Sequence, residues 1–292
     1  MLAPSMTPRA LSPGSILLAL ALALAGLVLA LEVQVVLRAA LVGEPVAVAQ
    51  QVVVRQPAAL ALAQLVGLGG PLLLALRLRG EPVTAFVSRA ASPCPWDRVA
   101  AAGIAGLALQ LPLVELTHRV EAAFPGLART PDEEARLAEL MRIDSMGDAV
   151  LVPLAVIVLA PVTEELLFRG LAQPDLAARI GRPAALLLVA SLFAAFHLDP
   201  VSAPAIAVAG LCLGALADRW RSVRPGLAMH AGVNALPVLL SEDVAVIPGF
   251  NTRDGSAIDP VLVAVSGVVG AVAFAFALRP AAARSTADVG SG

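Results

Sequence analysis

The chain contains no lysine and no tyrosine, and it carries few charges of either sign. Only 14% of its 292 residues are charged and 59% are hydrophobic, and its mean hydropathy is +0.86. Soluble domains carry about 25% charged residues, so this composition indicates an integral membrane protein. A net charge of -2 argues against a nucleic-acid partner. The two cysteines lack CxxC spacing, which argues against a disulfide framework and a thiolate metal site.

Eight apolar runs come close to the length needed to cross a membrane, which is roughly 20 residues for a helix. Continuous apolar runs rich in Gly and Ala favour helices over lipid-facing strands. The sequence therefore predicts an all-α, polytopic transmembrane helical bundle of about eight spans. The runs cover about residues 15–31, 58–76, 99–116, 147–170, 183–199, 201–217, 225–240 and 260–278.

The arginines follow every second run, and the acidic loops lie between the others. By the positive-inside rule, this predicts that the arginine-rich face and both termini are cytoplasmic, in a multi-pass protein of the cell membrane. The first run could instead be a cleaved signal peptide, although its length favours a retained helix. The arginines of this face are Arg77, Arg79, Arg89, Arg98, Arg179, Arg182, Arg219, Arg221, Arg224, Arg279 and Arg284.

Two adjacent carboxylates, Glu164 and Glu165, and the nearby Arg169 interrupt the fourth run. A charged side chain in the bilayer costs about 2.5–3.5 kcal/mol on insertion scales, so this group needs an explanation. Glu165 and Arg169 are four residues apart in the favourable order, so they can form a structural ion pair. Glu164 is rotated by about 100° from Glu165 and can point elsewhere. Alone, such a group is usually an interfacial salt bridge.

Two further motifs place histidines in later apolar runs. Phe193 and His197 are four residues apart in the fifth run, and His230 and Asn234 have the same spacing in the seventh. Residues four apart share one face of a helix. Three helices could therefore direct Glu164, His197, His230 and Asn234 toward one cavity, where polar side chains inside a membrane favour a functional site.

This set of side chains supports hydrolysis in two ways. In the first, Glu164 is a general base for water, and the histidines with Asn234 polarise a carbonyl and stabilise the oxyanion. In the second, Glu164, His197 and His230 bind a divalent metal such as zinc, and Glu165 is the base. The usual zinc-protease helix motif HExxH is absent. Both chemistries stay open at this point.

In this order, the motifs resemble the CPBP intramembrane protease family, which includes type II CAAX prenyl endopeptidases and bacteriocin-processing or self-immunity proteins. The family pattern is EExxxR, then FxxxH, then HxxxN, and all three parts occur here within about residues 145–240. The resemblance implies an intramembrane endopeptidase that acts on a membrane-associated peptide or protein within the lipid bilayer. A non-catalytic scaffold or self-immunity protein of the same fold, and a proton-coupled transporter, are the alternatives.

The resemblance also implies a role for each residue. Glu164 would activate water, with Glu165 assisting. His197 would position water or contact a metal, and His230 with Asn234 would form an oxyanion site. Members of the family are described both as metalloproteases and as metal-independent glutamate proteases, so the metal stays open.

The expected domain organisation follows from the runs and from the resemblance. Residues 1–14 form an N-terminal tail, 15–140 form N-terminal transmembrane helices and external loops, and 145–278 form the protease-like core. Residues 279–292 form a disordered tail. Within the second part, residues 32–57 are expected to form an external loop or amphipathic element, and residues 130–145 to form a surface helix.

One expectation conflicts with the others. If the fourth run ends near residue 170, Glu164 lies close to the cytoplasmic side. His197 would then lie about 21 Å from that side, at 1.5 Å per residue.

Overall fold

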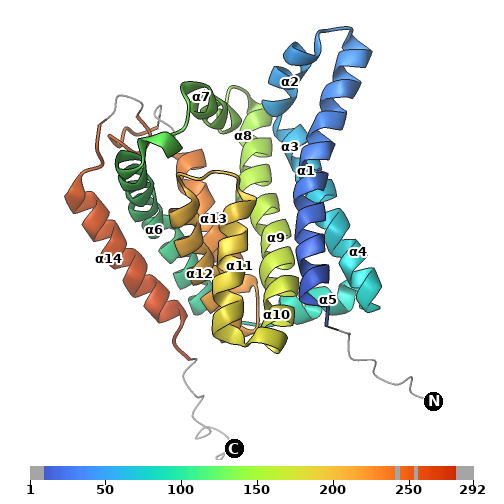
Figure 1. Cartoon of the computed structure of the whole chain (residues 1–292). Helices are drawn as coiled ribbons and strands as arrows, with labels where there is room; N and C mark the ends of the chain where they lie inside the picture. Colours follow the sequence, from blue (N-terminus) through green and yellow to red (C-terminus); the bar gives the residue numbers. More distant parts are fainter. Residues whose placement is uncertain (1–9, 241–243, 253–255, 281–292) are drawn as a thin grey trace, which may run out of the picture.

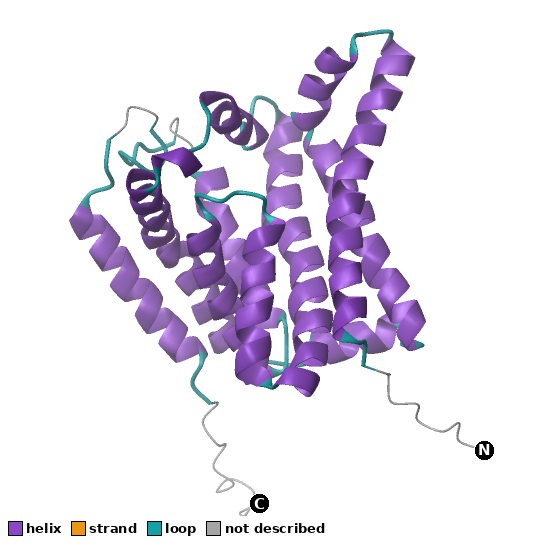
Figure 2. Cartoon of the chain, viewed as in Figure 1, coloured by secondary structure: helices purple, strands orange, loops and turns teal. Residues whose placement is uncertain are grey.

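The computed structural model describes residues 10–240, 244–252 and 256–280. Every regular element in these ranges is a helix and none is a strand, which confirms the all-α fold (Figures 1 and 2). Residues 1–9 of the expected N-terminal tail and residues 281–292 of the expected C-terminal tail lie outside the described ranges.

Each of the eight predicted runs is mostly helical, but the fifth extends past the helix that ends at Phe196 and the sixth begins before the helix that starts at Ala203. The helices also differ in length. Within the described ranges, six helical stretches are long and apolar enough to cross a membrane. These are α1 (Pro13–Val42), α3–η1–α4 (Pro57–Gln64, Leu65–Gly69 and Gly70–Arg79), α6 (Trp96–Ala123), α8 to α10 (Met146–Ile180), α12 (Ala203–Trp220) and α14 (Pro260–Ala277).

Two helices of the bundle are shorter than these six. They are α11 (Arg182–Phe196), with 15 residues, and α13 (Arg224–Leu239), with 16 residues. A count of eight membrane spans therefore stays a prediction. Figure 1 places the start of α1 and the end of α14 at the same end of the bundle, as an even number of crossings requires. The assignment of that end to the cytoplasm also stays a prediction.

Shorter helices connect the long ones outside the main bundle. They are α2 (Val46–Val54), α5 (Val83–Ala90), η2 (Pro125–Leu127) and α7 (Pro131–Leu140). The surface helix expected after residue 130 is confirmed as α7, because Thr130 and Glu133 form a reciprocal capping box at its start. By contrast, residues 32–57 were expected to form a loop or amphipathic element, but the first part of this segment is helical. The helix α1 continues to Val42 and ends at Gly43.

The conflict over the depth of Glu164 disappears because the helical stretch that contains the fourth apolar run continues beyond residue 170, to Ile180. Residues Met146–Ile180 form a continuous 35-residue helical stretch, with Glu164 near its middle. His197 directly follows α11, which starts at the arginine-rich end. Both side chains therefore lie well away from that end.

Prolines shape this long helical stretch. It consists of α8 (Met146–Pro153), the π-helix η3 (Leu154–Leu159), α9 (Ala160–Glu165), the π-helix η4 (Leu166–Ala172) and α10 (Gln173–Ile180). Each π-helix is followed at the second residue by a proline, Pro161 or Pro174, and η1 is followed in the same way by Pro71. Proline has no N–H for the carbonyl four residues earlier and clashes with it. The wider π turn accommodates this defect within a continuous helix.

The helix α13 is central to the bundle, because it packs against α6, α12, α9 and η3. Its contact with α6 depends on glycines that let the two backbones meet. A Cβ on Gly106 would lie 2.0 Å from the Met229 carbonyl oxygen, and a Cβ on Gly232 would lie 2.5 Å from the Gly103 carbonyl oxygen. Glycine at these positions therefore lets α6 and α13 meet backbone to backbone.

A buried ion network attaches the N-terminal helices to the core. Arg79, at the end of α4, donates to both carboxylate oxygens of Asp175 in α10 at 3.0 and 3.1 Å. Its Nε lies 3.3 Å from Glu81, which also accepts from Arg89 of α5. The backbone N–H of Leu11 donates to Asp175. Since Asp175 and Glu81 are about as buried as Arg79, charge pairing limits the cost of burying this network.

We expect Gly106→Ala to lower the free energy of unfolding by about 1–3 kcal/mol, because the added methyl forces α6 away from α13. Gly69→Ala is the matched control, since nothing lies within 4 Å of a Cβ at that helical position. The control should be neutral or slightly stabilising. Thermal unfolding in detergent measures both variants, and equal stability of the two would contradict the tight contact.

Candidate functional site

The centre of the predicted site is a buried group of three side chains. Arg169 in η4 donates through Nη1 to Glu165 Oε1 at 2.9 Å, and both side chains are 0% exposed. His230 of α13 places Nδ1 3.2 Å from the same carboxylate oxygen. A carboxylate oxygen only accepts, so a neutral His230 carries its proton on Nδ1 and presents Nε2 as an acceptor. The ion pair expected from the sequence therefore also orients the imidazole.

Small residues on neighbouring helices provide the space for these charges. The second terminal nitrogen of Arg169 donates to the carbonyl oxygen of Gly210 in α12 at 3.2 Å. A Cβ on Gly226 of α13 would lie 2.9 Å from Glu165 Oε2. The guanidinium group also lies 4.1 Å from the ring centroid of Phe193, a cation–π contact. Each buried charge thus has specific partners, while Glu165 Oε2 and Arg169 Nε have no hydrogen-bond partner among the described residues.

Glu164 differs from its neighbour in exposure and in contacts. Its side chain is 13% exposed, and Oε2 lies 3.7 Å from His230 Nε2. This distance is too long for a direct hydrogen bond, but it allows a water molecule to contact both atoms. Glu164 Oε2 is buried and has no protein hydrogen-bond partner in the part of the chain that the structure describes. Glu165 Oε2 is also buried without a partner among these residues, so Glu164 is distinguished by its partial exposure and by its oxygen beside His230 Nε2.

His197 lies at the exposed end of α11, further from this group than the sequence pattern suggests. Its Nδ1 lies 2.8 Å from the Phe193 carbonyl oxygen, within its own helix end. Its ring packs edge-on against Phe193 at 4.8 Å, and Phe193 packs in the same way against His230 at 5.7 Å. Both imidazoles therefore contact one phenyl ring. Among the described residues, no hydrogen bond or ion pair joins His197 to Glu164 or His230.

The backbone that follows His197 is strained. Leu198 has a φ of 53°, a left-handed conformation that is unfavourable for a residue with a branched side chain. Arg129 restrains this turn, because it forms an ion pair with Asp199 at 2.5 Å and also donates to Ser202. The position of His197 thus depends on a contact with the segment before α7.

Asn234 connects α13 to the helix that carries the two glutamates. Its side-chain amide donates to the Val156 carbonyl oxygen at 2.9 Å. Val156 lies in the π-helix η3, whose bonding pattern differs from that of an α-helix, so a carbonyl can turn outward to accept this bond. One N–H of the amide is used here and the second is left for another acceptor.

The residues predicted to hold a metal do not form a metal site as they are placed. Within the described ranges, no group of three or more His, Cys, Asp or Glu side chains could hold a metal ion. Glu164 and His230 approach each other, but His197 Nδ1 is bonded to a backbone carbonyl at an exposed helix end. A metal bound by Glu164, His197 and His230 would require His197 to move, and it stays a prediction.

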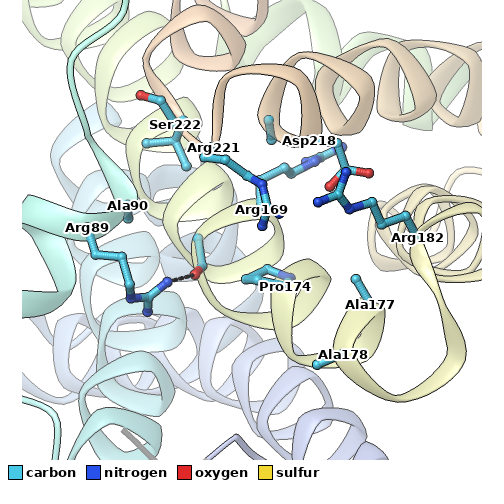
Figure 3. Close-up of a pocket in the computed structure, with 13 residues that line it drawn as sticks. Arg89, Ala90, Arg169, Pro174, Ala177, Ala178, Arg182, Asp218, Arg221 and Ser222 are labelled. Carbon is cyan, nitrogen blue, oxygen red and sulfur yellow. Dashed lines mark hydrogen bonds between the residues drawn. The ribbon is translucent and has the colours of Figure 1, made fainter. Parts of the chain in front are cut away.

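A cavity of about 420 Å³ reaches the group from the arginine-rich end (Figure 3). Arg169 and Gly170 line it, whereas Glu164, His197, His230 and Asn234 do not. The single cavity expected to contain all four predicted residues is therefore not this one.

Two residues that contribute to the site, Gln173 and Gly226, were not predicted from the sequence. Gln173, buried one turn after Arg169, donates to the Gly214 carbonyl oxygen at 2.9 Å, parallel to the bond from Arg169 to Gly210. The sequence does contain an indication of this pair of bonds. The donors Arg169 and Gln173 are four residues apart, and so are the acceptors Gly210 and Gly214. Gly226 was also missed, and its sequence position alone gives no indication that it contacts Glu165.

These observations define a helical membrane protein with a buried Glu–Arg–His group and a second glutamate beside it. Residues 147–236 match the family model described as "Type II CAAX prenyl endopeptidase Rce1-like". The match confirms the resemblance inferred from the motifs and includes every predicted site residue. At the level of the family, it supports a membrane protease. Neither the curated proteins nor the solved structures contain a match to this chain.

We expect Arg169→Gln to lower the free energy of unfolding by about 3–5 kcal/mol, because it leaves the buried Glu165 carboxylate without its cation. The matched control is Arg119→Gln. Arg119 forms an ion pair of the same spacing with Glu115 at 2.8 Å, but it is 75% exposed. Such surface pairs contribute about 0–1 kcal/mol. Thermal unfolding in detergent compares the two variants, and similar losses would show that the buried pair has no special role in stability.

A second prediction concerns Asp199, which lies outside the spanning helices. Burial alone would raise the pKa of Asp199, but hydrogen bonds from Arg129 and Ser202 outweigh it and lower the pKa below its usual value. This stabilisation is therefore present above about pH 3.9, the unfolded value, and is lost as the pH falls through the lower folded pKa.

Arg129→Gln should therefore reduce stability at neutral pH by about 1 kcal/mol. The difference from the wild type should shrink as Asp199 becomes protonated in the folded protein. Unfolding midpoints measured across the acidic range test this. A difference that stays constant with pH would contradict the assignment to Asp199.

Proposed function

We propose that the chain is an intramembrane endopeptidase that hydrolyses a peptide bond of a membrane-associated protein or peptide with water activated by Glu164. One observation carries the proposal. Glu164 Oε2 is buried, has no protein hydrogen-bond partner among the described residues and lies 3.7 Å from His230 Nε2. The family match over residues 147–236 supports the same class of reaction.

In the proposed first step, a water molecule lies between Glu164 and His230. It donates one hydrogen bond to Glu164 Oε2 and the other to His230 Nε2, so that an oxygen lone pair points toward the substrate carbonyl carbon. Glu164 removes one proton as the new C–O bond forms. His230 holds the water in place because Glu165 has fixed its proton on Nδ1.

The tetrahedral intermediate then carries a negative charge on the former carbonyl oxygen. The second N–H of the Asn234 amide is the proposed donor to this oxygen, one helical turn from His230. Glu164 returns its proton to the amide nitrogen, the C–N bond breaks, and the products are a carboxylate and an amine. His197, at the exposed end of α11, would contact the substrate segment that enters.

In this mechanism Glu165 is a positioning residue. Its charge is neutralised by Arg169 and its Oε1 already accepts two hydrogen bonds. These two bonds direct Glu165 toward Arg169 and His230, so its proposed role is to orient the imidazole. No observation favours the transporter alternative, because the stretch that carries both glutamates continues through its π-helices and is not split into half-helices.

Glu164→Gln should reduce the rate of peptide-bond cleavage by at least about 100-fold, the typical contribution of a general base. It should leave the thermal midpoint almost unchanged, because Glu164 has no strong partner to lose. Glu165→Gln should reduce both activity and stability. The substrate is sought by comparing membrane proteomes of cells that express the wild type or Glu164→Gln, and cleavage is then measured on the purified candidate.

Glu115→Gln is the activity control, since Glu115 is a partly buried glutamate of α6 outside the site. Cleavage that is equally fast in the wild type and Glu164→Gln would exclude this mechanism. In that case a non-catalytic scaffold or self-immunity function would be favoured.

A further inference from the structure

The cavity at the arginine-rich end is enclosed by elements that are distant in sequence (Figure 3). Arg89 comes from α5, Arg169 from η4, Arg182 from the first turn of α11 and Arg221 from the turn between α12 and α13. Asp218 is the one carboxylate among the residues that line it. This cavity of about 420 Å³ is called the arginine pocket.

The charges in the arginine pocket are not balanced. Arg169 is neutralised by Glu165, and Arg89 pairs with Glu81 at 3.0 Å. Among the described residues, no ion pair joins Arg182 or Arg221 to a carboxylate within 4 Å. Only Asp218 therefore opposes two exposed arginines, and the pocket keeps a positive potential.

Two further observations indicate that the arginine pocket is built to bind a ligand. The Arg169 side chain is 0% exposed, yet its Nε has no hydrogen-bond partner among the described residues. Arg221 has a φ of 50°, so a strained left-handed residue carries a charge at the pocket wall.

We propose that the arginine pocket binds an anion of the phosphate class. Guanidinium groups from separate elements suit a tetrahedral anion with several oxygens better than a planar carboxylate, which one arginine can bind at two atoms. A free phosphate and the phosphodiester of an anionic lipid headgroup share this chemistry. The proposal does not rest on the proposed peptidase activity, although Arg169 belongs both to the pocket wall and to the buried group with Glu165.

The test measures thermal unfolding of the full chain in a zwitterionic detergent against increasing concentrations of three probes. These are sodium phosphate, a short-chain phosphatidylglycerol and a phosphatidylcholine with the same acyl chains, each with sodium chloride at equal ionic strength as reference. A ligand that binds only the folded state raises the midpoint in a saturable way. We expect such a rise with phosphatidylglycerol or with phosphate, and a smaller one with phosphatidylcholine.

The variant Arg182→Gln/Arg221→Gln should weaken this binding by at least about tenfold, since each arginine removed takes charge-assisted hydrogen bonds with it. Arg77→Gln is the matched control, because Arg77 is an exposed arginine near the same end of the bundle but does not line the pocket. A response to phosphatidylglycerol alone identifies a lipid headgroup as the ligand. A response to sodium phosphate as well identifies free phosphate as sufficient.

A third variant keeps the proposal testable if the double variant does not fold. Asp218→Asn removes the opposing carboxylate and should tighten binding of the same probe. The proposal is overturned if no probe raises the midpoint beyond the salt reference. It is also overturned if the response survives in Arg182→Gln/Arg221→Gln as it does in Arg77→Gln, or if Asp218→Asn leaves the affinity unchanged.

Discussion

The buried ion pair between Glu165 and Arg169 is the interaction on which the rest of the site depends. Two charges that are fully removed from water are stable only if each also has hydrogen-bond partners. The structure supplies them through the Gly210 carbonyl oxygen and His230 Nδ1. The same bond to Glu165 Oε1 determines which nitrogen of His230 faces Glu164. The same contacts therefore stabilise the bundle and orient the site.

The backbone around this pair is equally constrained. The two π-helices lie directly before and after α9, the short segment that ends in the two glutamates. Each π-helix shifts the angular positions of the residues that follow it, since it inserts extra backbone into a turn. Because a proline follows each of these π-helices, the sequence itself determines where the shifts occur. In this arrangement Glu165 contacts both Arg169 and His230 Nδ1, and the adjacent Glu164 approaches His230 Nε2.

The sequence allowed the helices, the surface helix after Thr130 and the pairing of Glu165 with Arg169 to be predicted, because these features follow from local spacing and hydrophobicity. The contacts of Asn234 with Val156 and of Gly226 with Glu165 could not be predicted, since they depend on how separate helices cross. The exposed position of His197 was missed for a related reason. Its motif gives a helix face but not the residue at which α11 ends.

Arg169 belongs both to the site and to the wall of the arginine pocket. Its contacts limit how binding in the pocket can affect the site. Its Nη1 is committed to Glu165 and its Nη2 to Gly210, while Nε is left without a partner. An anion bound in the pocket would attract the guanidinium, but moving it away would leave a buried carboxylate uncompensated. Occupancy of the pocket would therefore change the strength of the Glu165 contact without breaking it. Because Glu165 Oε1 accepts from both Arg169 and His230, that change would affect His230 directly and Glu164 only through His230.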